Sequence, residues 1–79
     1  MASALQEKNN YEMDDVDIKI LKYLSAGTSQ DEIIEIFKST DIKPNSKSAI
    51  EKRISKLKDF FKANNTIHLV TITKDMGII

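Results

Sequence analysis

Cations and small hydroxyls share one side of a predicted helix over residues 46–63, SKSAIEKRISKLKDFFKA. Its apolar residues recur at the spacing of a single helical stripe, made of Ile50, Ile54, Leu57 and Phe61. The opposite side carries Ser48, Lys52, Ser55, Lys56 and Asp59. Between Lys47 and Lys62, six basic residues stand against two acidic ones, a net charge of +4. The pattern predicts a helix that packs on a core through one face and contacts a nucleic-acid groove through the other.

Residues for catalysis or metal binding do not gather in the sequence. The one histidine, His68, stands in an apolar-rich segment, and the chain has no cysteine. The acids Asp14, Asp15 and Asp17 are explained by helix capping rather than by a metal site. There is no glycine-rich phosphate loop and no nucleophile paired with a base. We therefore expect a protein that is not an enzyme, with no catalytic residues, no metal site and no cofactor.

The charge distribution is more informative than the total charge. Twelve basic and twelve acidic residues give a net charge of zero over 79 residues, which argues against a purely electrostatic DNA binder. Residues 1–35 carry eight acidic and three basic groups, so the basic helix stands against an acidic N-terminal half. This separation favours an orientation-dependent binder, and a solvated charged helix is the alternative. No apolar run could cross a bilayer, and MASALQEKNN lacks the features of a signal peptide, so we expect a cytoplasmic protein without membrane contact.

The chain divides into a tail and one small helical domain. Residues 1–12 have no apolar period and are interpreted as a flexible N-terminal tail or linker, which leaves residues 13–79 as the domain. Apolar periodicity predicts an all-α fold of four helices, and a strand over residues 67–73 is the alternative for the last of them. The helices are placed approximately at residues 15–26, 30–38, 46–63 and 66–76.

Capping residues place the starts of the first three helices. Each start carries a side chain that can accept from a backbone N–H, and the first two have an acid three positions later that completes a capping box. The expected caps are Asp14 with Asp17, Ser29 with Glu32, and Ser46. Ser48 with Glu51 forms a competing capping box that would start the basic helix two residues later. Gly27 is the expected stop after the first helix.

The last predicted helix has two apolar sides in a domain too small to bury both. Ile67 and Val70 lie on one side, and Leu69, Ile72 and Met76 lie on another. An apolar stripe is costly to leave in water, so the pattern predicts a dimer contact, and a fully inserted helix is the alternative. The expected interface residues are Ile67, Val70, Thr71 and Lys74.

Residues from Met13 to Ile79 match the residue pattern of a known class of domain at many positions. SQDEIIEIF at residues 29–37 mirrors a pattern S-x-x-E-I-A-x-x-L, and SAIEKRISKL at residues 48–57 stands in place of T-V-x-x-H-x-x-x-I. The AG after the first helix and the closing GII correspond as well, as do Phe61, Asn65, Leu69 and Val70. These residues resemble the LuxR/GerE-type DNA-binding domain at the end of bacterial response regulators.

This resemblance implies a four-helix helix-turn-helix domain that regulates transcription in a bacterial two-component system. Its third helix would enter the major groove of double-stranded DNA, and its fourth would form a two-fold homodimer. An upstream receiver domain and RNA polymerase are further partners that it implies. By position, Glu51, Lys52 and Ser55 would face base edges, and Ser48, Arg53 and Lys56 would lie near the sugar–phosphate backbone. The full set of expected DNA-binding residues is Thr28, Ser29, Lys47, Ser48, Glu51, Lys52, Arg53, Ser55 and Lys56.

The sequence departs from the family pattern in three ways. Glu51 stands where the family often has a basic residue, which is unfavourable unless the carboxylate accepts from a cytosine amino group or pairs with Lys47 or Lys52. The segment between the second and third helices is longer than the usual turn, so either the second helix is longer or the turn is more open. Arg53 replaces a frequent histidine and would keep a phosphate donor.

Two other functions fit the same fold. One is a protein-interaction module that docks on a sensor, a polymerase or another regulator, with weak or no DNA binding. The other is a domain that has kept only the fold and the dimer contact. The dependence of binding on salt separates a DNA-binding protein from these two alternatives. The affinity of a DNA-binding protein for duplex falls steeply as the ionic strength rises.

Overall fold

Four α-helices make up the secondary structure of residues 13–79, which are the part of the chain that the computed structural model describes. They are α2 (Asp15–Ser25), α3 (Gln30–Ser39), α4 (Lys47–Phe61) and α5 (Thr66–Asp75). The predicted all-α, four-helix fold is confirmed, and the strand alternative for the last segment is wrong because Thr66–Asp75 is helical. The tail predicted for residues 1–12 lies outside the described residues.

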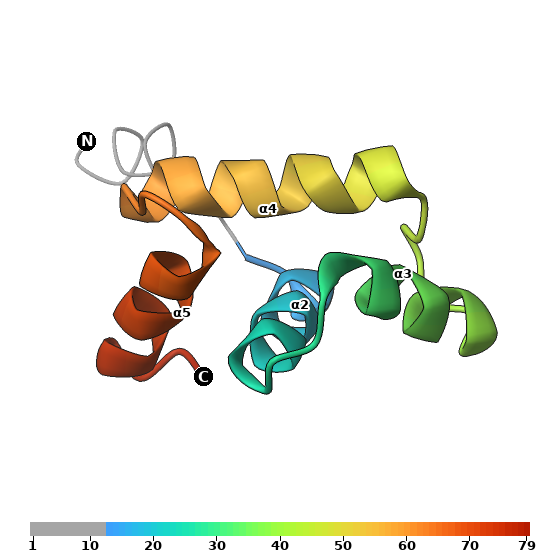
Figure 1. The fold of residues 1–79 in the computed structure, drawn as a ribbon, viewed down its shortest axis with the longest axis horizontal. Coiled ribbons are helices and arrows are strands. Elements are labelled where there is room, and N and C mark those ends of the chain that lie inside the picture. Colours follow the sequence, from blue (N-terminus) through green and yellow to red (C-terminus); the bar gives the residue numbers. More distant parts are fainter. Residues whose placement is uncertain (1–12) are drawn as a thin grey trace, which may run out of the picture.

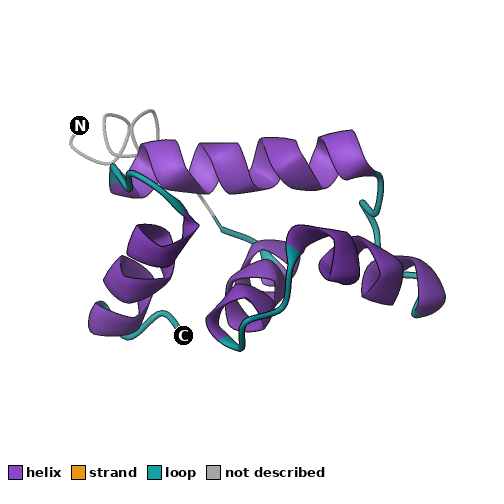
Figure 2. Ribbon diagram, viewed as in Figure 1, coloured by secondary structure: helices purple, strands orange, loops and turns teal. Residues whose placement is uncertain are grey.

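The longest of these helices, α4, lies along one side of the domain (Figure 1). The helices α5, α2 and α3 lie beneath it in that order, from its C-terminal end to its N-terminal end, and each of them contacts it. Loops join the four helices (Figure 2). None of the other described helices covers the opposite side of α4 (Figure 1).

Two apolar clusters form the core, and both α2 and α4 contribute to each. The first consists of Ile20, Ile33, Ile34, Phe37, Ile50 and Ile54. The second consists of Leu21, Leu57 and Leu69. Burial of each such side chain stabilises the fold by roughly 1.5–3 kcal/mol before the loss of conformational entropy is counted. The predicted stripe of the basic helix is therefore what attaches it to the domain.

Helix boundaries differ slightly from those predicted. The helix predicted over 46–63 runs from Lys47 to Phe61, and Ser46 is its N-cap because the Ser46 hydroxyl accepts from the N–H of Ala49 at 3.2 Å. The competing start with Ser48 as cap is wrong. The other three helices each differ from prediction by a single residue at the C-terminal end, where α2 ends at Ser25, α3 at Ser39 and α5 at Asp75.

All four described helices begin and end in the same manner. Their N-caps accept a backbone N–H through a side chain and are Asp14, Ser29, Ser46 and Asn65. Just after each helix a residue adopts positive φ, and the next N–H donates to the carbonyl five positions back, which is the Schellman arrangement. These left-handed residues are Gly27, Asp41, Lys62 and Gly77. Two of the four are glycines, and Asp41 and Lys62 adopt this conformation in spite of their Cβ atoms.

The turn between α3 and α4 is open rather than shortened by a longer helix. Only one residue is added to α3 relative to the prediction, and the remaining length, residues 40–46, lies outside helices. Ile42 from this turn packs against the first core cluster. The turn is thus tied to the core although it is long.

The left-handed conformation of Lys62 gives a test of the helix end. Lys62 has φ 56°, a region that costs a residue with a Cβ about 1–2 kcal/mol and costs glycine little. We expect Lys62→Gly to raise the free energy of unfolding by up to about 1 kcal/mol, after the entropy that glycine adds to the unfolded chain is subtracted. Urea denaturation followed by circular dichroism measures the change.

The matched control is Lys52→Gly, the same substitution at an exposed lysine in the interior of α4. There glycine lowers the free energy of unfolding by about 1 kcal/mol, because the helix interior gains nothing from its freedom. Equal losses of stability in the two variants would contradict the left-handed end at Lys62.

Candidate nucleic-acid interface

Six of the seven predicted DNA-binding residues of α4 gather on one exposed face. We call this face the α4 surface; it consists of Lys47, Ser48, Glu51, Lys52, Ser55 and Lys56, all of which are exposed. It lies opposite the buried Ile50, Ile54 and Leu57, so packing of the stripe on the core determines which side chains face outward. Asp59 is also exposed, one turn beyond Ser55. The surface can offer cations to phosphates and hydroxyls to phosphates or base edges.

The start of α3 lies beside the α4 surface. Gln30, the first residue of α3, donates from Nε2 to Oε2 of Glu51 at 3.2 Å. The two other residues predicted here are Thr28, which is half-buried, and Ser29, which is exposed. The structure therefore brings Thr28 and Ser29, at a helix N-terminus that can bind a phosphate, next to the expected base-reading helix.

The capping box at Ser29 already uses part of this helix end. The N–H of Ser29 donates to Oε1 of Glu32 at 2.9 Å, and the N–H of Glu32 donates to the Ser29 hydroxyl at 3.2 Å. Hydrogen bonding from the Ser29 N–H, and secondly from its hydroxyl, lowers the pKa of the Glu32 carboxyl. A phosphate at this end of α3 would meet an ionised Glu32 nearby, so Thr28 and the free N–H groups of the first turn are the better donors.

Glu51 has a partner that the sequence did not indicate. Within residues 13–79 it forms no ion pair with Lys47 or Lys52, and its side chain is held instead by Gln30. The two residues are 21 positions apart, so no local pattern could have paired them. A neutral amide thus orients the carboxylate without cancelling its charge.

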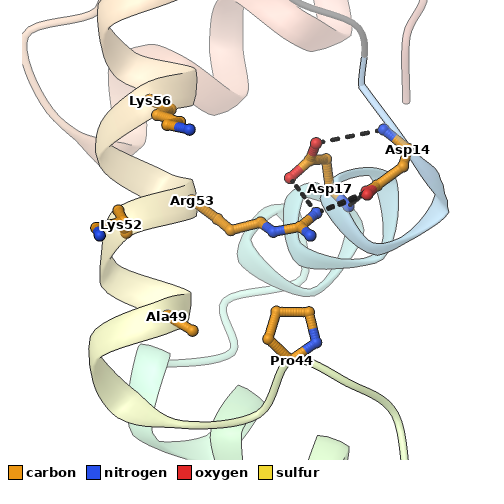
Figure 3. Close-up of a pocket in the computed structure, with 7 residues that line it drawn as sticks. All are labelled: Asp14, Asp17, Pro44, Ala49, Lys52, Arg53 and Lys56. Atoms are coloured by element: carbon orange, nitrogen blue, oxygen red, sulfur yellow. Dashed lines mark hydrogen bonds and ion pairs between the residues drawn. The ribbon is translucent and has the colours of Figure 1, made fainter.

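Arg53 leaves the α4 surface and reaches the start of α2 (Figure 3). Its Nη1 donates to Oδ1 and Oδ2 of Asp14 at 2.7 and 2.9 Å, and to Oδ1 of Asp17 at 3.1 Å. The side chain of Asp17 is 2% exposed and that of Arg53 is 27% exposed. We call these three residues the Arg53 clamp. The predicted contact of Arg53 with a DNA phosphate stays a prediction, and any such contact has to use donors other than those bound to the two acids.

The clamp shifts the pKa values of Asp14 and Arg53. The hydrogen bond from Arg53, followed by that from the N–H of Asp17, holds the pKa of Asp14 below its ordinary value. Hydrogen bonding to Asp14 in turn raises the pKa of Arg53 against the opposing effect of its partial burial. Asp17 was predicted as half of a capping box, and that box is present. Its spacing from Ile20 and Leu21 also places it on the buried stripe of α2, which was a signal that this acid needs a cation.

A cavity of about 320 Å³ lies between α4 and the start of α2. Its lining consists of Asp14, Asp17, Pro44, Ala49, Lys52, Arg53 and Lys56. Figure 3 shows the Lys52 ammonium pointing away from the two acids while Arg53 points at them. Lys52 and Lys56 are exposed cations, whereas Arg53 is the cation that forms ion pairs with Asp14 and Asp17.

Three of the four predicted dimer residues of α5 lie at a second cavity, of about 240 Å³, beside the end of α2. Its lining includes Leu24, Ile67, Val70 and Thr71, whereas Lys74 is exposed further along α5. Ile67 is 79% exposed. The alternative of a fully inserted helix is therefore wrong.

The inward side of α5 contains a residue that the sequence did not mark. Thr73 is fully buried, as is Leu69, and the Thr73 hydroxyl donates to the carbonyls of Leu69 and Val70, each at 3.0 Å. Its polar group is thus satisfied within its own helix, which is how a threonine can occupy a core position. Periodicity missed it because threonine is not counted as apolar.

No family model, curated protein or solved structure matches this chain.

Among the helices of residues 13–79, none combines the length and the apolar composition that a membrane span requires. The same residues contain no group of three or more side chains placed to hold a metal ion. The site is therefore interpreted from its own geometry.

The lowered pKa of Asp14 predicts how acid affects stability. Because this pKa lies below its ordinary value of about 4, the contact with Arg53 contributes fully above that pH and is lost as the pH falls through the lowered value. Asp14→Asn keeps an N-cap and removes the charge. We expect the variant to be less stable than the wild type at pH 7 and to lose less stability between pH 7 and about pH 2–3, as measured by urea denaturation at each pH.

Asp15→Asn is the matched control, since Asp15 is an exposed acid in the same helical turn and forms none of the clamp contacts. It should keep the acid dependence of the wild type. If Asp14→Asn and the control show the same pH profile, the clamp does not contribute to stability.

Proposed function

We propose that this domain binds double-stranded DNA in a sequence-specific manner and regulates transcription. The observation that carries the proposal is the α4 surface, on which exposed cations and hydroxyls lie opposite a buried apolar stripe. An α-helix fits the width of the major groove, so this surface can approach base edges while its lysines meet phosphates. The start of α3 lies beside it and would contact the backbone through Thr28 and the first N–H groups.

The LuxR/GerE-type resemblance supports this proposal through residues 29–37 and 48–57. Those segments correspond to α3 and to most of α4, the two helices that a helix-turn-helix domain places at DNA. On this interpretation the protein is a bacterial, cytoplasmic output domain of a two-component response regulator or a small relative of one. A receiver domain and RNA polymerase are then its further partners.

Arg53 has a positioning role in this mechanism. Lys52 and Lys56 are exposed, whereas Arg53 is joined to Asp14 and Asp17 on α2. Its ion pairs restrain rotation of α4 about its own axis, and that rotation decides which side chains face a groove. Lys52 and Lys56 are the residues we assign to phosphate contact.

A homodimer through α5 completes the proposal. Ile67 is exposed beside a cavity lined by Leu24, Val70 and Thr71, and a second copy of α5 would cover these side chains. Two-fold pairing presents two α4 surfaces to successive turns of one DNA face. Binding of one copy alone is weak on this view, because a single short helix has few cations for phosphate contact.

A protein-interaction module is the second candidate function, and the exposed Ile67 favours it. The same side of α5 could dock a sensor, a polymerase or another regulator instead of its own copy. The two functions differ at α4, because a docking module does not require the lysines there to contact phosphates.

Lys52 provides the test at α4. We expect Lys52→Ala to weaken binding to any duplex and to reduce the slope of log affinity against log salt by about one, because one phosphate contact is lost. Fluorescence anisotropy with a labelled duplex at several salt concentrations measures the slope. Lys19→Ala, at an exposed lysine of α2 outside the α4 surface, should leave the slope unchanged. A wild-type chain that binds no duplex at low salt would refute the proposal.

Ile67 provides the test at α5. Since Ile67 is 79% exposed, Ile67→Glu should leave the fold intact and place repelling charges at the two-fold contact. We expect affinity for a duplex with two half-sites to fall by at least about tenfold, with binding to a single half-site unchanged. Met76→Glu is the control, because Met76 is 62% exposed at the other end of the helix and outside the cavity. Equal effects of the two variants would contradict an interface centred on Ile67.

A further inference from the structure

We propose that Glu51 and Gln30 form a base-reading pair that selects cytosine in the major groove. This inference rests on the proposed function, and it assigns a target chemistry to two residues of that site. The pair joins the first residue of α3 to the N-terminal half of α4 through the hydrogen bond from Gln30 Nε2 to Glu51 Oε2 at 3.2 Å.

The position of the pair suits contact with bases. Glu51 is exposed in the second turn of α4, and residues near the N-terminus of a recognition helix are those that reach base edges. Gln30 is half-buried at the start of α3, and its amide donates to the carboxylate across the two helices. The Glu51 carboxylate is therefore held in place before DNA arrives, which lowers the entropic cost of the contact.

The Glu51 carboxylate of the pair can only accept hydrogen bonds. Gln30 occupies one oxygen of Glu51, so the other carboxylate oxygen and the amide oxygen of Gln30 are left to accept hydrogen bonds. In the major groove cytosine presents only its N4 amino donor. Guanine presents two acceptors, thymine presents an acceptor and a methyl group, and adenine places the N7 acceptor beside its amino group. A carboxylate is repelled by each of those acceptors, so cytosine is the base that it favours.

The charge of Glu51 makes this selection stricter. Within residues 13–79 no lysine pairs with Glu51, although Lys47 and Lys52 are on the same helix. Near DNA the carboxylate is unfavourable unless a base donor meets it, because phosphates surround the groove. A wrong base at this position therefore costs the missing hydrogen bond together with the uncompensated charge.

Selection from a random duplex pool with the full 79-residue chain tests the pair. The wild type should enrich a motif containing an invariant cytosine. Glu51→Gln should shift that position to adenine, because glutamine binds the N6 and N7 edge of adenine. Gln30→Ala should weaken the preference at the same position. Glu35→Gln, at an exposed glutamate later in α3, is the matched control and should return the wild-type motif.

Titrations with single duplexes make the result quantitative. Replacing the selected cytosine by thymine, with its paired base, should weaken the wild type by about tenfold. Glu51→Ala should remove this difference and at the same time bind unrelated duplex more tightly than the wild type does, because a charge near the phosphates is gone. A merely structural role of Glu51 predicts the opposite, a loss of binding to all sequences alike.

The outcomes separate this inference from the proposed function. Identical motifs for the wild type and Glu51→Gln would overturn the base-reading pair and leave DNA binding in place. A wild-type motif without a cytosine that responds to Glu51 would also overturn it. If the wild type enriches no sequence and binds no duplex, the proposed function and the inference both fail.

Discussion

Burial of one apolar stripe on α4 is the contact on which the rest of this domain depends. The stripe enters both core clusters, with Ile50 and Ile54 in the first and Leu57 in the second. Among the described helices α3 and α5 do not contact each other, so α4 and α2 are what join the two ends of the domain. Because the stripe must face inward, the opposite side of α4 must face solvent. The exposed cations are thus a consequence of the core, and the proposed interface follows from the same pattern that builds the fold.

Apolar burial is not directional, so burial of the stripe sets the rotation of α4 on the core only approximately. The Arg53 clamp restrains this rotation further, because its hydrogen bonds are directional. It ties α4 to the first turn of α2, where Asp14 also caps the helix and Asp17 is buried. At the other edge of α4, Gln30 and Glu51 form a polar link to the start of α3. The helix is held at both edges by contacts that depend on the positions of individual atoms.

Local chemistry made most of the fold predictable. Capping side chains and glycines act over a few residues, so the starts of the helices and the stop at Gly27 could be located from the sequence. The end of α4 could not, because Lys62 adopts a left-handed conformation that its residue type does not favour. The outward face of α4 followed from periodicity. Its neighbours did not, since the partners of Arg53 and Glu51 lie 39 and 21 positions away and depend on how the helices pack.

The separation of charge between α4 and the acidic first half of the chain has a kinetic consequence. A neutral protein experiences little net attraction towards a distant polyanion, but its dipole experiences a torque once the two are within about 10 Å, the screening length near physiological salt. On the proposed function, such a molecule would diffuse without being captured by every nucleic acid it passes, and it would turn its basic helix towards DNA only at close range. Compared with a strongly cationic domain, this protein would associate with DNA more slowly. It would also bind less to abundant RNA through non-specific charge attraction.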